Sequence, residues 1–182
     1  MAPRATPSDA EPAPGRLERA LARHLDLIWR VLRRAGLSQA DAEDTAQDVF
    51  WVLARRLQQV PEAAERSFLI STALRMASDR RRSKWSTVTL AFDGDSEQLE
   101  ATAPDEAIDL RRAQLMLDAA LDTLPPPERD VFVLVELEEL TRAEAARALS
   151  MSEGTVASRL ARARERFHAA LKRLQARARR RA

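Results

Sequence analysis

Cysteine is absent from the 182-residue sequence, and histidine occurs only at His24 and His168. The lack of cysteine excludes disulfide bonds and thiolate metal sites. Both histidines fall within predicted helices, where a packing or surface role is commoner than a ligand role, so we expect no metal and no cofactor. The four glycines are isolated, which excludes a glycine-rich phosphate loop. No nucleophile with a neighbouring base is visible, and we expect the chain not to be an enzyme.

Long apolar runs are also missing, so no segment is expected to cross or insert into a membrane. Residues 1–15 hold four of the nine prolines and no apolar core. This composition predicts a disordered tail and not a signal peptide. We therefore expect the chain to be cytoplasmic.

Charge is arranged in blocks, although the net charge is only +2. Residues 16–83 hold 13 basic and 9 acidic residues, residues 84–110 hold 1 and 7, and residues 111–182 hold 15 and 10. Two basic blocks that flank an acidic bridge indicate a polyanionic partner contacted at two places.

The first basic block has the periodicity of helices. Apolar residues recur at helical spacing over 17–35, and Gly36 is expected to end that helix. Ser38 begins the next helix in the manner of a capping box. A third helix is predicted from Phe68 into a run of arginines. Together these segments predict a compact three-helix domain over 16–85.

The second half of the chain repeats this helical character after a break. Residues 86–110 lack sustained periodicity and are predicted to form a flexible acidic linker. A second helical domain is expected over 111–177, with a basic tail at 178–182. Within it, Thr141 opens a short helix with a capping box and Ser152 caps a long one. No strand pattern occurs, so the predicted fold class is all-α, with two small helical domains.

The strongest functional pattern is the short helix, tight turn and capped long helix of this second domain. One face of the long helix is apolar, while its other face presents Thr155, Ser158, Arg159 and Arg162, with Arg164 at its flank. A helix of this kind fits the major groove of DNA. A solvated basic face on an ordinary helix is the alternative, but the arrangement of the two helices favours a DNA-binding helix-turn-helix.

The strings LPPPER at 124–129, LTRAEAA at 140–146 and GTVASRLARARE at 154–165 resemble region 4 of the extracytoplasmic-function (ECF) sigma factors, the smallest class of the sigma-70 family. AEDTAQDVF at 42–50 is similar to region 2.2, and FLISTALRMASDRRR at 68–82 resembles regions 2.3 and 2.4. The resemblance implies a promoter-specificity factor that binds core RNA polymerase, recognises the −10 and −35 promoter elements and initiates transcription.

Carried over position by position, the resemblance assigns a role to three groups of residues. The contacts to the clamp helices of polymerase would be Asp44, Gln47 and Asp48. The −10 contacts would be Val60, Arg75, Asp79, Arg80, Arg81 and Arg82, with residues 58–67 as the loop that holds a flipped-out base. The −35 contacts would be Arg142, Thr155, Ser158, Arg159, Arg162 and Arg164.

The sequence departs from the family pattern at several of these positions. Arg75 stands where the family commonly has an asparagine that helps to read the flipped base, so the −10 specificity is not carried over. Val60 stands where an aromatic is frequent, and Phe68 where tryptophan is usual. Ala157 and Ala161 replace positions that are often basic or bulky, which concentrates the expected −35 contact on the remaining polar residues.

The partners implied are core RNA polymerase, through its clamp helices and flap, and promoter DNA, with an anti-sigma factor as a further candidate. Two other functions stay open at this point. The chain could be an ordinary regulator that uses only its helix-turn-helix, with the first domain as a sensor or dimerisation module. It could also be an antagonist that sequesters polymerase without binding DNA, although the retained arginines at 159, 162 and 164 argue against this.

Overall fold

The computed structural model describes residues 15–87 and 105–180, and the side chains of residues 15–82 and 111–180. Over these residues the chain is all-α, as predicted, and has no strand. Predictions for residues 1–14, for 88–104 within the acidic linker and for 181–182 lie outside the described residues. The elements are α1 (Arg16–Arg34), α2 (Gln39–Arg55), the 3-10 turn η1 (Glu62–Ala64), α3 (Glu65–Thr87), α4 (Asp105–Leu121), α5 (Pro126–Phe132), the π-helical turn η2 (Val133–Leu137), α6 (Arg142–Ala148) and α7 (Glu153–Arg179).

The predicted helix boundary signals are in place. Gly36 follows α1 with a φ of 96°, a left-handed conformation that favours glycine. The Oγ atoms of Ser38 and Ser152 each accept a hydrogen bond, 3.2 Å long, from a backbone amide three residues on. Thr141 and Glu144 form the complete reciprocal capping box that opens α6.

Three boundaries differ from the sequence-based prediction. The third helix starts at Glu65 and not at Phe68, because Glu65 is drawn into the interior by an ion pair. Helix α4 starts at Asp105, inside the predicted linker. Helix α7 runs to Arg179, past the predicted start of the basic tail.

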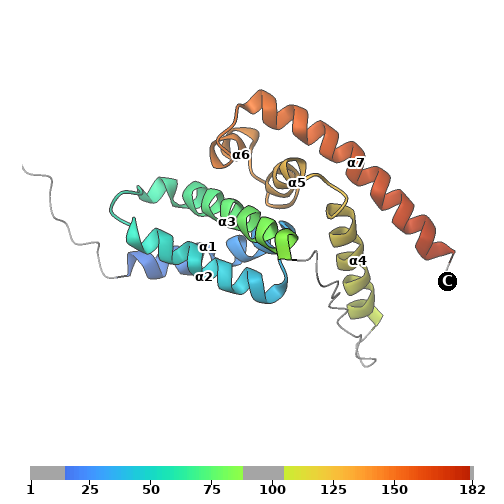
Figure 1. Ribbon diagram of the computed structural model, residues 1–182, viewed down its shortest axis with the longest axis horizontal. Helices are drawn as coiled ribbons and strands as arrows, with labels where there is room; N and C mark the ends of the chain where they lie inside the picture. The colour runs from blue at the N-terminus through green and yellow to red at the C-terminus, as the bar shows by residue number, and fades with distance from the viewer. Residues whose placement is uncertain (1–14, 88–104, 181–182) are drawn as a thin grey trace, which may run out of the picture.

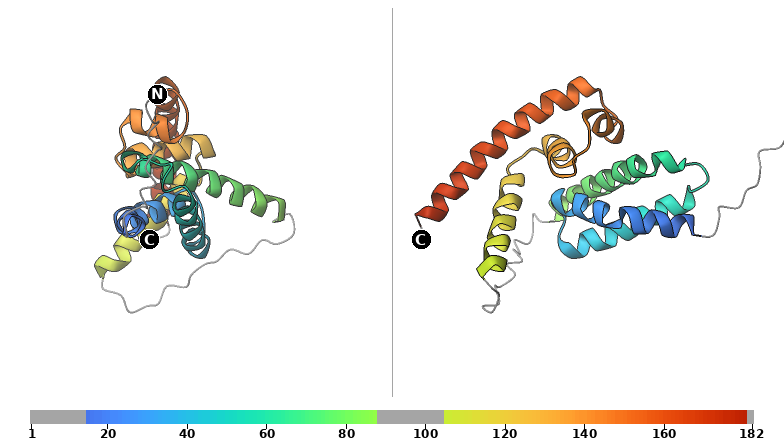
Figure 2. Two further views of the ribbon diagram at one scale, coloured as in Figure 1. Left: turned by 90° about the vertical axis from the view of Figure 1, so that its left-hand side faces the viewer. Right: turned by 180° about the vertical axis from the view of Figure 1, so that it is seen from behind.

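Helices α1, α2 and α3 pack together around the first part of the core. The fully buried side chains there come from the predicted apolar stripes and include Ile28, Val49, Leu53 and Leu69. Helix α7 covers the outer side of α4, α5 and α6, which lie between it and the first three helices (Figures 1 and 2). Its seam of Val156, Leu160 and Ala163 is buried, as its spacing predicts.

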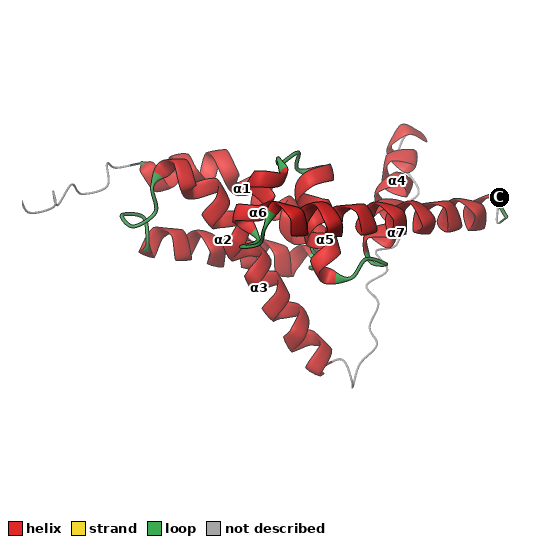
Figure 3. Cartoon of the chain, turned by 90° about the horizontal axis from the view of Figure 1, so that it is seen from above, coloured by secondary structure: helices red, strands yellow, loops and turns green. Residues whose placement is uncertain are grey.

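The two halves of the chain are docked against each other. Buried apolar residues of both halves form one continuous core cluster, and α6 packs on α3 (Figure 1). Seen from above, the last turns of α3 project beyond the neighbouring helices (Figure 3). None of the helices in the described part of the chain is both long enough and apolar enough to span a bilayer.

Candidate functional site

The exposed face of α2 carries the residues expected to contact polymerase. Asp44, Gln47 and Asp48 are all exposed, while their neighbours Val49 and Phe50 are buried. The Oδ2 atom of Asp48 lies 3.2 Å from Nη2 of Arg80 on α3. The three predicted polymerase contacts therefore share one accessible strip, as helical spacing requires.

Trp51 extends this strip by one helical turn and was not predicted as a site residue. Its side chain is 66% exposed, the largest value among the exposed large hydrophobic residues of the described chain. With Asp48, Val52 and Met76 it borders a surface hollow of about 370 Å³. A large aromatic off the apolar stripe, three residues after Asp48, is the signal that could have identified it.

The predicted −10 contacts fall into two groups in the structure. Arg75, Asp79 and Arg82 are exposed on α3, and Arg82 forms an ion pair with Asp79. Arg80 is held between two carboxylates of α2, at 3.2 Å from Asp48 and 3.5 Å from Asp41. Arg80 thereby joins this part of α3 to the exposed strip of Asp44, Gln47 and Asp48 on α2.

Arg81 and Val60 lie apart from that group. The guanidinium of Arg81 donates a hydrogen bond to the Ala35 carbonyl and faces Asp130 of α5, with 4.0 Å between Nη2 and Oδ1. Val60 is only 7% exposed, so its side chain belongs to the core. In the docked conformation, neither side chain is presented to a DNA strand.

The segment predicted to hold a flipped base is anchored by Arg16, which sequence analysis did not single out. The Arg16 side chain donates from Nε to Oε1 of Glu65 at 2.8 Å, from Nη1 to the Leu57 carbonyl at 2.7 Å and from Nη2 to the Val60 carbonyl at 2.5 Å. The side chain of Glu65 is 2% exposed. This buried ion pair ties the start of α1 to both ends of the turn before α3.

The start of the helix-turn-helix is built as predicted. Arg142 and Ser158 are exposed, whereas Thr155 is half-buried because its hydroxyl lies 2.9 Å from that of the capping Ser152. Ser158 donates to the Thr155 carbonyl at 3.0 Å. The first turns of α7 therefore present small hydroxyl groups beside the arginines.

The arginines of α7 lie on two opposite flanks of the helix. Arg162 and Arg166 point toward the Glu128 carboxylate of α5, at 3.8 and 3.3 Å. Arg164 lies on the other flank, 2.6 Å from Glu136. Each of these three arginine side chains remains more than half exposed, whereas the Glu128 carboxylate between Arg162 and Arg166 is only 10% exposed.

Arg159 is half-buried near the base of the helix-turn-helix, where its Nη1 lies 3.7 Å from Sδ of Met151. It also neighbours Asp130, whose Oδ1 accepts no hydrogen bond within the described residues. Burial raises the pKa of Asp130 to about 6, against the attraction of Arg81, Arg129 and Arg159.

Comparison with known proteins matches both halves of the chain. Residues 20–87 match the family model for sigma-70 region 2, and residues 114–167 match the model for sigma-70 region 4. The RNA polymerase sigma-E factor of Streptomyces coelicolor is 33% identical over 138 residues, which cover 76% of each chain. The chain belongs to the ECF sigma factors of the sigma-70 family. This confirms the predicted family and the predicted two-part all-α fold.

Two further ECF sigma factors extend this comparison. The ECF RNA polymerase sigma factor SigL of Mycobacterium tuberculosis is 30% identical over 156 residues, covering 84% of this chain and 88% of SigL. The ECF RNA polymerase sigma factor SigE of Mycolicibacterium smegmatis is 33% identical over 144 residues, covering 78% of this chain. The alignment spans only 56% of that SigE, so the SigE chain is considerably longer.

Two solved structures share the fold. CnrH, solved in complex with the cytosolic domain of CnrY, has a TM-score of 0.62 at 23% identity and covers 86% of this chain and 87% of its own. The sigma factor RpoE from Bartonella quintana, solved with the anti-sigma factor NepR, has a TM-score of 0.68 at 16% identity. The match covers 87% of this chain and 98% of RpoE. Sigma factors are non-enzymatic factors of transcription initiation. Membership of this family confirms the predicted function in transcription initiation.

Proposed function

We propose that the chain binds core RNA polymerase through α2, reads the −10 element with η1 and α3, and reads the −35 element with α6 and α7. The observation that carries this proposal is the strip of Asp44, Gln47 and Asp48, exposed in the same chain as a capped helix-turn-helix. Acidic residues repel DNA phosphates, so this strip suits a basic protein surface such as the polymerase clamp helices.

Trp51 strengthens the polymerase assignment of α2. An exposed tryptophan beside carboxylates offers the large, rigid apolar area that anchors protein interfaces. In the docked conformation Asp44, Gln47 and Asp48 are exposed, and the strip is bordered by α3, where Arg80 pairs with Asp48. Polymerase can therefore reach the strip without any rearrangement of the chain.

The −10 element is assigned to the turn before α3 and to the exposed arginines of that helix. Arg75 is exposed and can face a strand backbone. Arg82 and Arg80 can do so when their carboxylate partners, Asp79 for Arg82 and Asp41 and Asp48 for Arg80, are engaged elsewhere. The anchoring of the turn by Arg16 gives a flipped base a fixed loop to enter. Because Arg75 replaces the usual asparagine, the base preference at this position is expected to differ from that of the family.

The −35 element is assigned to the first half of α7. Ser158, Arg159 and Arg162 lie within three helical turns of the helix start, where recognition helices meet base edges and phosphates. An arginine that reads a guanine contributes about 1–3 kcal/mol of discrimination. We assign base contact to these three residues and phosphate contact to Arg142, Thr155 and Arg164.

We also propose that the chain acts in the cytoplasm and is controlled by an anti-sigma factor. CnrH and the Bartonella RpoE share the fold. CnrH was solved in complex with the cytosolic domain of CnrY, and RpoE was solved in complex with the anti-sigma factor NepR. The exposed Leu115 on α4 and the apolar hollow it borders with Met116 and Leu174 offer such a partner a surface.

Run-off transcription with purified core polymerase and a pool of genomic promoter fragments tests this function. The chain is expected to stimulate transcription from a subset of fragments, and mutation of either promoter element should abolish the stimulation. If no fragment is transcribed above the level of core polymerase alone, the proposal is wrong. The alternative of a regulator that uses only the helix-turn-helix then becomes the better account.

A further inference from the structure

A cavity of about 430 Å³ lies between the end of α1 and helices α4 and α5. Arginines of α1 form one wall, and polar residues of α4 form the other. Small-molecule sites have volumes of about 300–1,000 Å³ and carry a few polar groups that fix the orientation of the ligand. None of the residues assigned above to polymerase or to promoter DNA lines this cavity, so its use lies beyond the proposed function.

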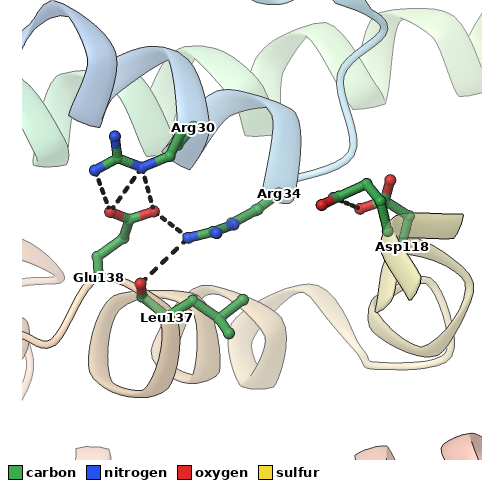
Figure 4. A network of polar contacts seen from close by, with 6 residues as sticks. Arg30, Arg34, Asp118, Leu137 and Glu138 are labelled. Carbon is green, nitrogen blue, oxygen red and sulfur yellow. Dashed lines mark hydrogen bonds and ion pairs between the residues drawn. The ribbon is translucent and has the colours of Figure 1, made fainter. Parts of the chain in front are cut away.

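The α1 wall carries an excess of positive charge from Arg30, Arg33 and Arg34. Arg30 and Arg34 share one counter-charge, the Glu138 carboxylate, which is 2% exposed and lies 2.9 Å from Nη2 of Arg30 (Figure 4). Among the described residues Arg33 pairs with no carboxylate, and its Nη1 donates to the Leu37 carbonyl at 2.7 Å. Three arginines against one glutamate leave two positive charges in excess on this wall.

The α4 wall carries a negative charge from Asp118, which accepts a hydrogen bond of 3.2 Å from Nε2 of Gln114. Asp118 forms no ion pair with any arginine or lysine in the described part of the chain. Figure 4 shows Arg30 and Arg34 turned toward Glu138, while Asp118 lies apart from them on α4. Opposite charges therefore face the same cavity from two walls without pairing across it.

Arg129 of α5 holds the two walls in place. Its Nε donates to the Arg34 carbonyl at the end of α1, and its Nη1 donates to Asp122, just after α4, at 2.7 Å. The guanidinium also lies over Gly36, where an added Cβ would stand 3.1 Å from Nη1. Because Arg129 is tied to the ends of both helices, the separation of the walls is fixed, as in the largely pre-formed sites of small molecules.

Trp29 gives the cavity an aromatic surface. Its side chain is half-buried, packs against the core cluster and lines the cavity on the α1 side. An aromatic ring in a fixed position can stack on a nucleobase, and such stacking tolerates every base because each has a π face. The cavity thus combines a cationic wall, a hydrogen-bond acceptor on the opposite wall and a stacking surface.

We propose that this cavity binds a nucleoside phosphate. Its phosphate oxygens accept hydrogen bonds from Arg33 and Arg34, because a guanidinium presents five N–H donors and Arg34 keeps some of them beside Glu138. The base stacks on Trp29, and hydroxyl or amino groups of the nucleoside donate to Asp118. A ligand with an anionic end and a donor end satisfies both walls, whereas a bare phosphate chain leaves Asp118 without a donor.

Isothermal titration calorimetry of the full chain tests the site with each of the four nucleoside triphosphates and with tripolyphosphate. The titrations use about 0.15 M salt, which screens exposed charges. At least one nucleoside triphosphate should bind at least about tenfold more tightly than tripolyphosphate, because only the nucleotide supplies a base and donors. At about 100 times its Kd, this nucleotide should raise the melting temperature by about 5–10 °C, since it contacts α1 and α4 together.

Two substitutions separate the walls of the cavity. Arg33→Gln should lower the nucleotide affinity at least about tenfold, because it removes a charged donor to the phosphates. Arg19→Gln is the matched control, since it makes the same change at an exposed position of α1, about 21 Å away along the helix. Asp118→Asn should reduce the preference for the nucleotide over tripolyphosphate, because it removes the charge that repels phosphate and weakens the acceptor. The melting temperature of each variant without ligand shows that its fold is retained.

Three results would overturn the proposal. The first is no binding of any of the four nucleotides, and the second is binding of tripolyphosphate as tight as that of the nucleotides. The third is an equal loss of affinity in Arg33→Gln and Arg162→Ala, which would move the nucleotide to the DNA-reading face of α7. Failure of the proposed function would leave these titrations unchanged, because they need neither polymerase nor promoter.

Discussion

The ion pair of Arg16 and Glu65 allows a stability prediction with a defined magnitude. Arg16→Met keeps the aliphatic stem but removes the guanidinium, so the Glu65 carboxylate, 2% exposed, loses its partner. The carbonyls of Leu57 and Val60 lose their donors at the same time. Breaking a buried pair in this way costs about 3–5 kcal/mol. At about 2–4 °C per kcal/mol for a chain of this size, the melting temperature falls by about 6–20 °C.

The double variant Arg16→Met, Glu65→Leu separates stability from function. It removes both charges, and because apolar replacement of a buried pair is often neutral, most of the lost stability should return. The turn between Leu57 and Glu65 still lacks its anchor. We therefore expect the double variant to bind core polymerase normally and to open the −10 element poorly.

Urea unfolding followed by tryptophan fluorescence measures these free energies, and permanganate footprinting of the promoter measures opening. A loss below about 1 kcal/mol in Arg16→Met would refute the reasoning, because that is the value of an exposed pair. A double variant as unstable as the single one would also refute it.

Two further predictions follow from single residues. Gly36→Ala should destabilise the chain by at least about 1–2 kcal/mol in urea unfolding, because the site has a φ of 96° and the new Cβ also meets Arg129; an unchanged midpoint would contradict this. Asp130→Asn should alter the pH dependence of stability, because burial raises the pKa of Asp130 to about 6 against the nearby Arg81, Arg129 and Arg159. The Asp130 carboxylate therefore binds a proton more readily in the folded chain than in the unfolded chain. As a result, the stability of the wild type relative to the variant rises as pH falls through 6 and levels off near pH 3.8, the ordinary pKa of an aspartate. Parallel pH profiles of the two proteins would show the assignment to be wrong.

Features encoded by neighbouring residues were predictable from the sequence. Ser38, Thr141 and Ser152 cap their helices as expected, since a cap is a contact over three residues. The exposure of Asp44, Gln47 and Asp48 follows from helical periodicity alone.

Features that depend on distant contacts were not predictable. Glu65 reads as an ordinary surface residue until Arg16, 49 residues earlier, is placed beside it. Glu138 and Arg30 lie 108 residues apart in the sequence, and no local sequence pattern indicates that their side chains form an ion pair. The placement of Arg81 in the boundary between the two halves has the same cause, because it depends on how region 4 packs on α3.

The central claim is that one chain uses α2 for polymerase and α7 for DNA, and paired substitutions test it most directly. Asp44→Arg is compared with Asp26→Arg, the same charge change at an exposed carboxylate of α1, and with Arg159→Ala on α7. The account predicts that Asp44→Arg abolishes both polymerase binding and run-off transcription, that Asp26→Arg changes neither, and that Arg159→Ala abolishes only transcription that depends on the −35 element. Full transcriptional activity in Asp44→Arg, together with its loss in Arg159→Ala, would contradict the account.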